Sequence, residues 1–290
     1  MATSVVRLFQ VPSVQTVWKL RWLRKRHLAL VVPSVILVVI VGACYLGPAI
    51  GNLGPPSVNN LANANLPIGS GGHLLGTDML GNDLLTRSLF GGRASFEIGF
   101  GSIGIGFIIG SFFGLIAGTY GGTTELVIMR IVDILLSLPA LIIALAVASA
   151  LGASLRNEIF AISFFTVPAY VRITRAQVLR QRSREFVLAS RIMGGSRFFV
   201  AIRHIYPNVL PTLMTFFPLG VGTAMIVEAA LSFLGLGIKP PQPSWGNMIA
   251  LGQSYLSTEP LDVIVPSIFL LLTVTSLNLL AEQLRLRWAK

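Results

Sequence analysis

Charged side chains are scarce in this sequence. They make up 11% of the 290 residues, whereas soluble domains carry about a quarter. Apolar residues account for 53%, and several runs exceed the ~18 residues that cross ~30 Å of hydrocarbon. The composition therefore excludes an ordinary soluble domain. It predicts an all-α, polytopic membrane protein built as one helical domain, with no room for a separate enzyme domain.

Cysteine and histidine are also rare. Cys44 is the only cysteine, so neither an intrachain disulfide nor a cysteine-based metal cluster can form. The three histidines, His27, His73 and His204, lack the spacing of metal ligands. We therefore expect this chain to bind no metal ion.

The motifs of common nucleotide-binding and hydrolytic sites are missing. The sequence contains no G-x-x-x-x-G-K-[ST] loop to hold a nucleotide phosphate, no G-x-S-x-G and no H-E-x-x-H. We expect no catalytic residue and no cofactor bound by the chain itself. Any energy source must be supplied by another polypeptide.

The charge that is present is mostly positive and lies mostly on one side. Of the 22 lysines and arginines, six fall in the N-terminal tail, eight in a central loop and three at the C-terminus. With six spans, all of these share one side of the membrane, Arg130 lies in or beside a span, and the rest lie opposite: Arg87, Arg93, Arg156 and Lys239. This positive-inside bias places both termini in the cytoplasm. It also argues against a nucleic-acid partner, because the basic residues follow the membrane topology.

Apolar runs predict six membrane-spanning helices. A signal peptide is disfavoured because the first run is long and lacks an A-x-A site. The expected spans are about residues 28–50, 97–119, 126–150, 159–175, 209–236 and 261–284. The expected division is a basic cytoplasmic tail (1–27), a first transmembrane helix (28–50), an extracytoplasmic loop (51–95), a core transmembrane domain (96–284) with a cytoplasmic loop at 176–208, and a cytoplasmic C-terminus (285–290).

Four glycines recur at every fourth position of the second expected span: Gly106, Gly110, Gly114 and Gly118. Such spacing gives a flat helix face against which another helix can approach closely. The pattern predicts core packing. It would also suit helices that move during gating.

The outer segments contain candidates for contact with an extracytoplasmic partner. Thr77 or Asp78 can cap an amphipathic turn, and we expect Asp78 and Asp83 either to form turns or to help seat a binding protein. A stiff proline-rich segment that includes Trp245 is expected to form an outer rim.

Three ionisable residues are expected at membrane depth, where charge is costly. Arg130 and Asp133 can pair along one helix face near the cytoplasmic end, and Pro139 is expected to kink that helix. Glu228 should face protein or water. All three are candidates for the pathway or its gate, with structural pairing and hydrogen bonding as the alternatives.

The central loop has internal structure. Eight arginines lie between Arg172 and Asn208. Ser183 can cap a short helix with Glu185 in its first turn, and Gly194 with the next glycine can end it. Ser196 can cap a second helix. The fourth span is expected to continue as helix into this loop, which gives a rigid connection to the membrane.

The first of these short helices presents a candidate docking face. Phe186, Ala189, Ser190 and Met193 share one side by helical spacing, and two arginines flank it: Arg184 and Arg191. A partner's shallow groove could hold this face. A helix packed against its own protein would show the same stripe, and a basic loop that only sets topology would carry the same charge.

Three stretches resemble ABC importer permeases. The central loop resembles the EAA loop, with Leu188 and Ser190 as departures from its first and third letters and Tyr206 replacing a leucine before Pro207. The stretches His73–Phe96 and Leu231–Met248 resemble the C-type subunit of dipeptide/oligopeptide permeases, with Asn82 where arginine is usual. The resemblance runs from about residue 70 to the C-terminus.

The resemblance implies a type I ABC importer permease fold in the cytoplasmic (inner) membrane of a prokaryote. It implies three kinds of protein partner besides the lipid bilayer: a homologous B-type permease, cytoplasmic ATPase subunits that bind ATP and Mg, and an extracytoplasmic peptide-binding protein. The ATPase contact would be the segment from Arg184 to Gly194. The implied mechanism is alternating access, with short peptides as the expected cargo.

Other functions are weighed against this one. Nickel or another peptide-like solute would use the same fold. An ion-driven secondary transporter would show inverted repeats with matched broken helices, and no convincing repeat is visible. A membrane-embedded enzyme would need paired carboxylates or histidine clusters at one depth.

Overall fold

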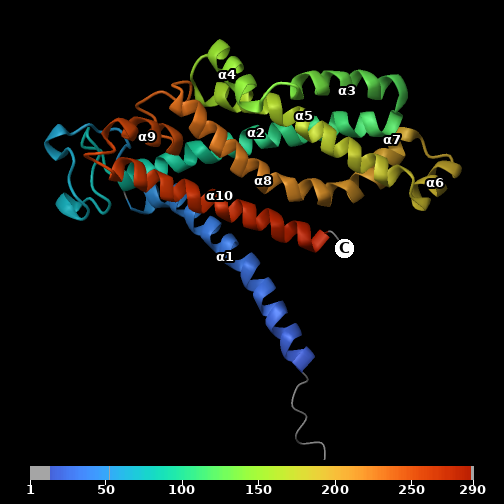
Figure 1. Ribbon diagram of the computed structural model, residues 1–290, viewed down its shortest axis with the longest axis horizontal. Coiled ribbons are helices and arrows are strands. Elements are labelled where there is room, and N and C mark those ends of the chain that lie inside the picture. Colours follow the sequence, from blue (N-terminus) through green and yellow to red (C-terminus); the bar gives the residue numbers. More distant parts are fainter. Residues whose placement is uncertain (1–13, 52, 289–290) are drawn as a thin grey trace, which may run out of the picture.

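The computed structural model describes residues 14–51 and 53–288, with side chains from residue 30 onward, and this part of the chain is all-helical (Figure 1). The longer helices are α1 (Val14–Ile50), α2 (Leu84–Tyr120), α3 (Gly122–Leu136), α4 (Ala140–Leu151), α5 (Leu155–Arg182), α8 (Tyr206–Phe233) and α10 (Leu261–Trp288). The shorter helices are α6 (Glu185–Ile192), α7 (Arg197–Val200) and α9 (Trp245–Gly252), with one turn of π-helix at Ala201–Ile205.

Within residues 14–51 and 53–288, five helices are long and apolar enough to cross a membrane, and the bent pair α3 and α4 makes a sixth if it counts as one span. The five candidates are Leu30–Ile50, Leu84–Tyr120, Leu155–Arg182, Arg197–Phe233 and Leu261–Trp288. The expected polytopic all-α architecture is confirmed. Helix α1 begins at Val14, inside the expected basic tail, and the rest of that tail (1–13) lies outside the described residues.

Helix α2 begins well before the expected second span. It starts at Leu84 because the carboxylate of Asp83 accepts a hydrogen bond from the backbone N–H of Thr86 at 2.7 Å and caps the first turn. Its 37 residues extend about 56 Å at 1.5 Å per residue, which exceeds the ~30 Å of hydrocarbon. The last part of the expected outer loop is therefore helix that continues the second span.

The glycine face of α2 packs directly against α5. Gly106, Gly110, Gly114 and Gly118 each face one residue of α5, in the order Thr166, Tyr170, Thr174 and Val178. A Cβ added at Gly114 would lie 2.6 Å from the Thr174 Cβ, and one at Gly118 would lie 2.6 Å from a methyl carbon of Val178. Both sets advance by four residues in the same direction, so the two helices run parallel. The expectation of close core packing is confirmed.

The third span is broken at Pro139. The expectation was a single kinked helix, whereas α3 and α4 meet at an angle of 87° across a break of three residues. Pro139 has extended backbone angles and precedes the first residue of α4. Proline cannot donate a backbone hydrogen bond to the preceding turn, and here the chain leaves the helix altogether.

Ion pairs between helices tie α3 to α5. Asp133 pairs with Arg172 of α5 at 2.6 Å, instead of with Arg130 of its own helix. Glu125 likewise accepts from the Nε of Arg175 at 2.6 Å. The expected pairing of Arg130 with Asp133 is therefore wrong, because the neighbouring helix brings a guanidinium to the same carboxylate.

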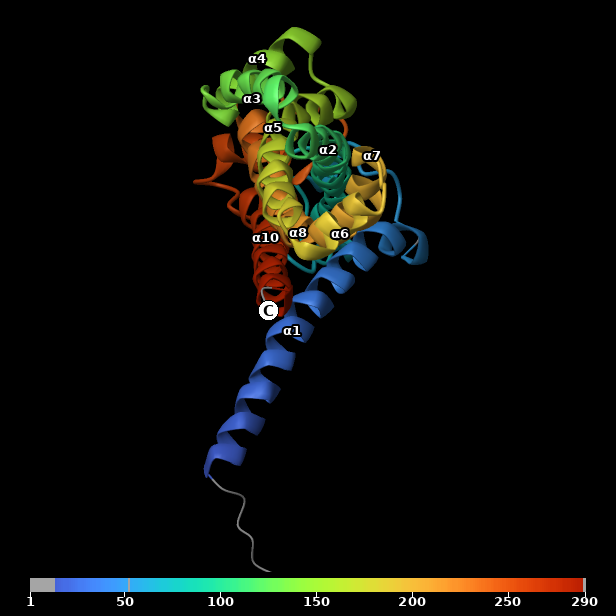
Figure 2. The same cartoon turned by 90° about the vertical axis from the view of Figure 1, so that its right-hand side faces the viewer.

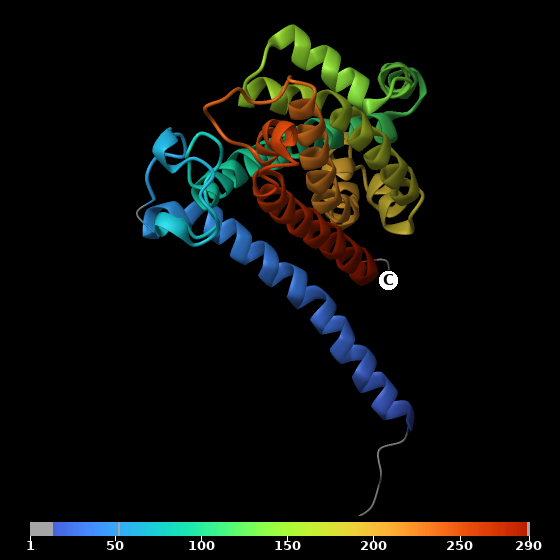
Figure 3. The ribbon, with the colours of Figure 1, turned by 60° about the vertical axis from the view of Figure 1, so that its left-hand side comes forward.

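Helix α1 stands partly apart from the bundle. Its C-terminal half packs against α10 and α2, while its other half projects away from the remaining helices (Figures 2 and 3). The loop that follows it gathers beside α9 at one end of the bundle, opposite α6 and α7 (Figure 1). The two ends of the molecule therefore carry different structures.

We predict that Gly114→Leu lowers the thermal stability of the purified protein. The new side chain would push against the Thr174 Cβ and against the Val171 carbonyl oxygen at 2.7 Å, and overpacking of this kind costs about 1–3 kcal/mol or more. Gly104→Leu is the matched control, since a Cβ there meets nothing within 4 Å. The measurement is the midpoint of thermal aggregation in detergent. Equal losses in both variants would contradict the packing account.

Candidate functional site

The segment between α5 and α8 forms a compact helical unit at one end of the bundle (Figure 1). Helix α6 follows α5 after two residues, and α7 follows α6 after a short turn. The expected helix, glycine break and second helix are all present. Ser183, however, ends α5 instead of capping α6, because its hydroxyl points back to the Arg180 carbonyl.

Helix α6 ends at the glycine pair as expected. The N–H of Gly195 donates to the Ser190 carbonyl at 3.0 Å, and Gly194 takes a φ of +91°, a left-handed conformation that favours glycine. The hydroxyl of Ser196 then accepts from the N–H of Phe199 at 3.2 Å and caps α7. These bonds fix the angle between the two short helices.

The inner side of this unit packs on the bundle. Val187 of α6 is fully buried in a small core built from α2, α5, α6, α7, the π turn and α8. Its members are Leu115, Val178, Val187, Val200, Ala201, Ile205, Val209 and Leu213. The shared core joins α6 to α5 and α8. The second short helix, the π turn and α8 also follow one another without a break, so α6 is attached to the long helices by packing as well as by the chain.

The outer side of α6 is apolar and exposed. Ile192 and Met193 are 87% and 81% exposed, and Phe186 and Leu188 are about half exposed. Of the expected docking face, Phe186, Ala189 and Met193 are exposed. The fourth residue, Ser190, is buried beside Val187. Sequence reasoning missed Leu188 and Ile192, because apolar spacing alone does not say which side of a short helix faces its own protein.

Polar residues border this apolar surface. Arg184 precedes α6 and is exposed, and Glu185 lies in the first turn, where the helix dipole favours an acid. Arg191 is half-buried, and its Nε has no hydrogen-bond partner among the residues that the structure describes. An exposed apolar patch with a polar border, away from the apolar spans, is typical of a protein–protein contact.

Glu228 lies at the other end of the bundle and is fully buried. Its carboxylate accepts hydrogen bonds from Ser244 at 2.6 Å and from Ser95 and Ser232 at 3.2 Å each. These donors belong to α2, α8 and the residue before α9, so the geometry fits the hydrogen-bonded alternative. The other two pathway candidates, Arg130 and Asp133, lie on α3, where both are exposed.

A second buried carboxylate was missed by the sequence reading. Glu158 of α5 is 1% exposed and lies within electrostatic range of Glu228. The sequence placed it in a short outer loop, although it falls in the first turn of α5. Only the tertiary packing of α5 on α8 brings these two acids together.

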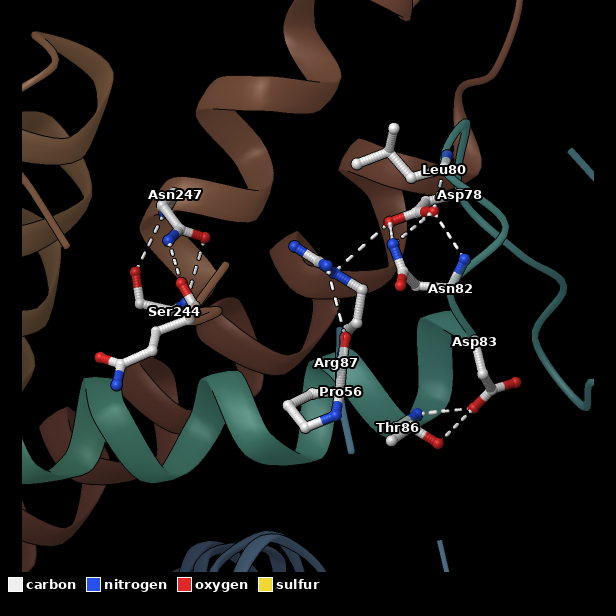
Figure 4. A network of polar contacts seen from close by, with 10 residues as sticks. Pro56, Asp78, Leu80, Asn82, Asp83, Thr86, Arg87, Ser244 and Asn247 are labelled. Atoms are coloured by element: carbon white, nitrogen blue, oxygen red, sulfur yellow. Dashed lines mark hydrogen bonds and ion pairs between the residues drawn. The ribbon is translucent and has the colours of Figure 1, made fainter. Parts of the chain in front are cut away.

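The outer loop candidates hold the fold together (Figure 4). Asp78 accepts hydrogen bonds from Leu80, from the backbone and side-chain amides of Asn82, and pairs with the Nε of Arg87 at 3.4 Å. Asp83 caps α2 and contacts the His73 ring at 3.0 Å. The expected turn and capping roles of these acids are seen, with Asp83 rather than Thr77 or Asp78 as the helix cap.

Trp245 is also a core residue. It is fully buried, and its indole N–H donates to the Ser88 carbonyl at 2.8 Å. Its ring meets Phe96 edge-on and stacks on Phe269. Trp245 is therefore not presented to a soluble partner at the surface, contrary to the expectation, because its ring is packed in the core.

We predict that Glu228→Leu destabilises the protein and that Glu228→Gln largely preserves it. Leucine leaves buried hydroxyl donors without their acceptor, at about 1–3 kcal/mol for each unsatisfied group, whereas glutamine retains one acceptor oxygen. Thr223→Ala, which removes an exposed hydroxyl from the same helix, is the control. The measurement is thermal stability of the purified protein. A glutamine variant as unstable as the leucine variant would show that the charge itself is required.

The chain matches the family described as "Binding-protein-dependent transport system inner membrane component" over residues 110–289. It is 35% identical over 279 residues to the glutathione transport system permease protein GsiD of Pectobacterium atrosepticum, covering 94% of this chain and 91% of that protein. It is 34% identical to the dipeptide transport system permease protein DppC of Alkalihalophilus pseudofirmus, covering 91% and 86%.

A third relative supports the same assignment. The di/tripeptide transport system permease protein DppC of Pseudomonas aeruginosa is 41% identical over 212 residues, covering 73% of this chain and 70% of that protein. The family match covers the α6–α8 segment, and the GsiD and A. pseudofirmus DppC matches cover enough of the chain to include the buried outer network as well. The chain therefore belongs to the binding-protein-dependent transport system inner-membrane components, the non-catalytic, multi-pass permease subunits of ABC transporters.

Proposed function

We propose that this chain forms half of the translocation pathway of an ATP-driven importer for di- or oligopeptides and that α6 couples it to a cytoplasmic ATPase. The exposed apolar surface of α6 carries the proposal. Phe186, Leu188, Ile192 and Met193 are presented to solvent by a helix whose other side is packed into the bundle. A groove on a soluble partner would bury this surface.

Coupling follows from how α6 is attached. It joins α5 through two residues and reaches α8 through α7 and the π turn, and its buried side contacts both helices through the shared core. ATP and Mg would bind to the partner ATPases. Closure of those subunits would move α6, and the packed core would pass that movement to α5 and α8 with little slack.

The remaining parts of the assembly follow from the family. A homologous B-type permease would supply the other half of the pathway, and a peptide-binding protein would deliver the cargo at the end of the bundle that carries the outer loop and α9. Both termini would then lie in the cytoplasm with α6. The residues of α6 and its borders, from Arg184 to Gly194, would form the ATPase contact.

A short peptide is the cargo that we favour. Relatives named for dipeptide, di/tripeptide and glutathione transport cover most of this chain. Nickel or another peptide-like solute would be carried by the same fold. An ion-driven secondary transporter is the alternative of another class, and uptake without ATP would distinguish it.

We predict that Phe186→Glu abolishes ATP-driven uptake in proteoliposomes while the chain still inserts and folds. Phe186 is 42% exposed, so the change costs little in the free chain, but burying the carboxylate in a partner's groove costs several kcal/mol. Tyr120→Glu is the matched control, with the same 42% exposure at the C-terminal end of α2, outside the α6 surface. Co-purification of the ATPase and uptake are measured together.

The control fixes how the result is interpreted. Loss of ATPase co-purification with Phe186→Glu alone would support the α6 contact. Normal assembly and uptake by that variant would contradict the coupling role of α6. Uptake by the unaltered chain without ATP or ATPase would instead overturn the ABC importer function.

A second prediction concerns the glycine break. Gly194→Pro should uncouple ATP hydrolysis from uptake, because proline cannot adopt a φ of +91° and lacks the N–H that donates to the Arg191 carbonyl at 3.0 Å. Gly194→Asn should retain most activity, since asparagine tolerates the left-handed region. The ratio of solute imported to ATP hydrolysed is the measurement, and equal ratios in both variants would show that the break is not needed for coupling.

A further inference from the structure

A large cavity lies between the ends of α5 and α10 and the start of α8. Its volume is about 950 Å³, within the range of pockets that bury a small organic molecule. All three helix ends lie toward the end of the bundle that carries α6 (Figure 1). The cavity is therefore on the side to which an importer releases its cargo.

Four arginines line this cavity: Arg180, Arg184, Arg285 and Arg287. Of these four arginines, only Arg285 forms an ion pair with another described side chain, Glu282, at 2.9 Å. Glu185 lines an adjoining hollow that shares Arg184. Counting both acids against the four arginines leaves an excess of about two positive charges, and a cleft lined by one sign of charge concentrates ions of the other sign.

The neutral lining suits a small polar anion. Gln177, Asn208 and Thr212 contribute amide and hydroxyl groups, and Trp288 contributes an indole. Guanidinium groups match a carboxylate with two parallel hydrogen bonds. The lining is thus rich in donors, as a carboxylate requires.

A second cavity, here called the upper cavity, lies along the same two helices and farther from the end that carries α6. The basic cavity and the upper cavity follow one furrow between α5 and α8. The upper cavity has a volume of about 190 Å³ and is lined mainly by apolar groups of α5 and α8, among them Phe165, Phe216 and Leu219. On α5, Ile173 of the upper cavity lies one turn before Gln177 of the basic cavity. On α8, Thr215 of the basic cavity comes directly before Phe216 of the upper cavity. The furrow between α5 and α8 therefore changes from apolar to basic along its length.

We propose that the basic cavity is a binding site for the carboxylate of the translocated solute as it leaves the furrow. This inference rests on the proposed function and narrows its substrate class. The apolar upper part accommodates uncharged side chains, and the arginines attract the anionic end of a peptide-like solute. A free dication such as nickel would meet a repulsive potential in the same place.

The test uses the assembled transporter in nanodiscs of zwitterionic lipid, with a cysteine replacing Thr212 in the basic cavity or Thr223 in the upper one. Cys44 is fully buried, so labelling of the unaltered chain gives the background. Each variant is reacted with a sulfonate-bearing and a trimethylammonium-bearing methanethiosulfonate. We expect the ratio of anionic to cationic rates to be about tenfold higher at Thr212→Cys than at Thr223→Cys.

Two further comparisons identify the cause and the ligand. Adding Arg180→Gln and Arg287→Gln to Thr212→Cys should remove most of this preference, and so should high salt. Dialanine should slow labelling at Thr212→Cys, whereas dialanine amide, which lacks the carboxylate, should not. Equal effects of the two dipeptides, or no preference for the anionic reagent, would overturn the proposal.

The remaining outcomes point to other occupants. If labelling slows when anionic phospholipid is added and dialanine has no effect, the cavity holds a lipid headgroup and the proposal is wrong. If Thr212→Cys reacts in the isolated chain and not in the complex, the ATPase covers the cavity and the proposal is also wrong. ATPase co-purification and ATP-driven uptake are followed in the same samples, so failure of the importer function is seen separately from failure of this site.

Discussion

The close parallel contact of α2 and α5 is the constraint on which the rest of the structure depends. Four glycines at four-residue spacing bring the backbone of α2 against Thr166, Tyr170, Thr174 and Val178 of α5. The outer end of α2 carries Arg87 and Ser95, which anchor the outer network, and the inner end of α5 leads into α6. A single helix pair therefore fixes the positions of both functional ends.

The two ends are held by different physical interactions. At the outer end, buried hydrogen bonds converge on Glu228, and an ion pair joins Asp78 to Arg87; such contacts are directional and fix one arrangement. At the end that carries α6, this helix is held by close apolar packing around Val187 and Ile205, so a shift of α6 requires its neighbours to shift with it. Directional hydrogen bonds thus hold one end of the bundle, and apolar packing holds the other.

Much of this arrangement could be predicted from the sequence because local chemistry determines it. The glycine spacing predicted the helix contact, and Gly194 and Ser196 predicted the break and the cap. The Asp133–Arg172 ion pair, the approach of Glu158 to Glu228 and the Ser95–Glu228 hydrogen bond could not be predicted, because each joins residues that are distant in the chain. Burial of Ser190 likewise depends on the core beneath α6. The furrow between α5 and α8 had no sequence signal, since its lining follows from how two helices are rotated about their axes.

The outer network has a consequence for how the protein is made. Ser95 hydrogen-bonds the backbone of Trp245, 150 residues later, and the Trp245 indole reaches back 157 residues to Ser88. At a synthesis rate of about 5–20 residues per second, the 150 residues from Ser95 to Trp245 take about 8–30 seconds to make, so α2 exists for that time without this partner. During this interval Ser88 and Ser95 lack the hydrogen bonds that they form with Trp245 in the folded protein. The outer end can therefore close only as the last helices arrive, and a nascent chain that stalls in its final third would present an incomplete structure to membrane quality control.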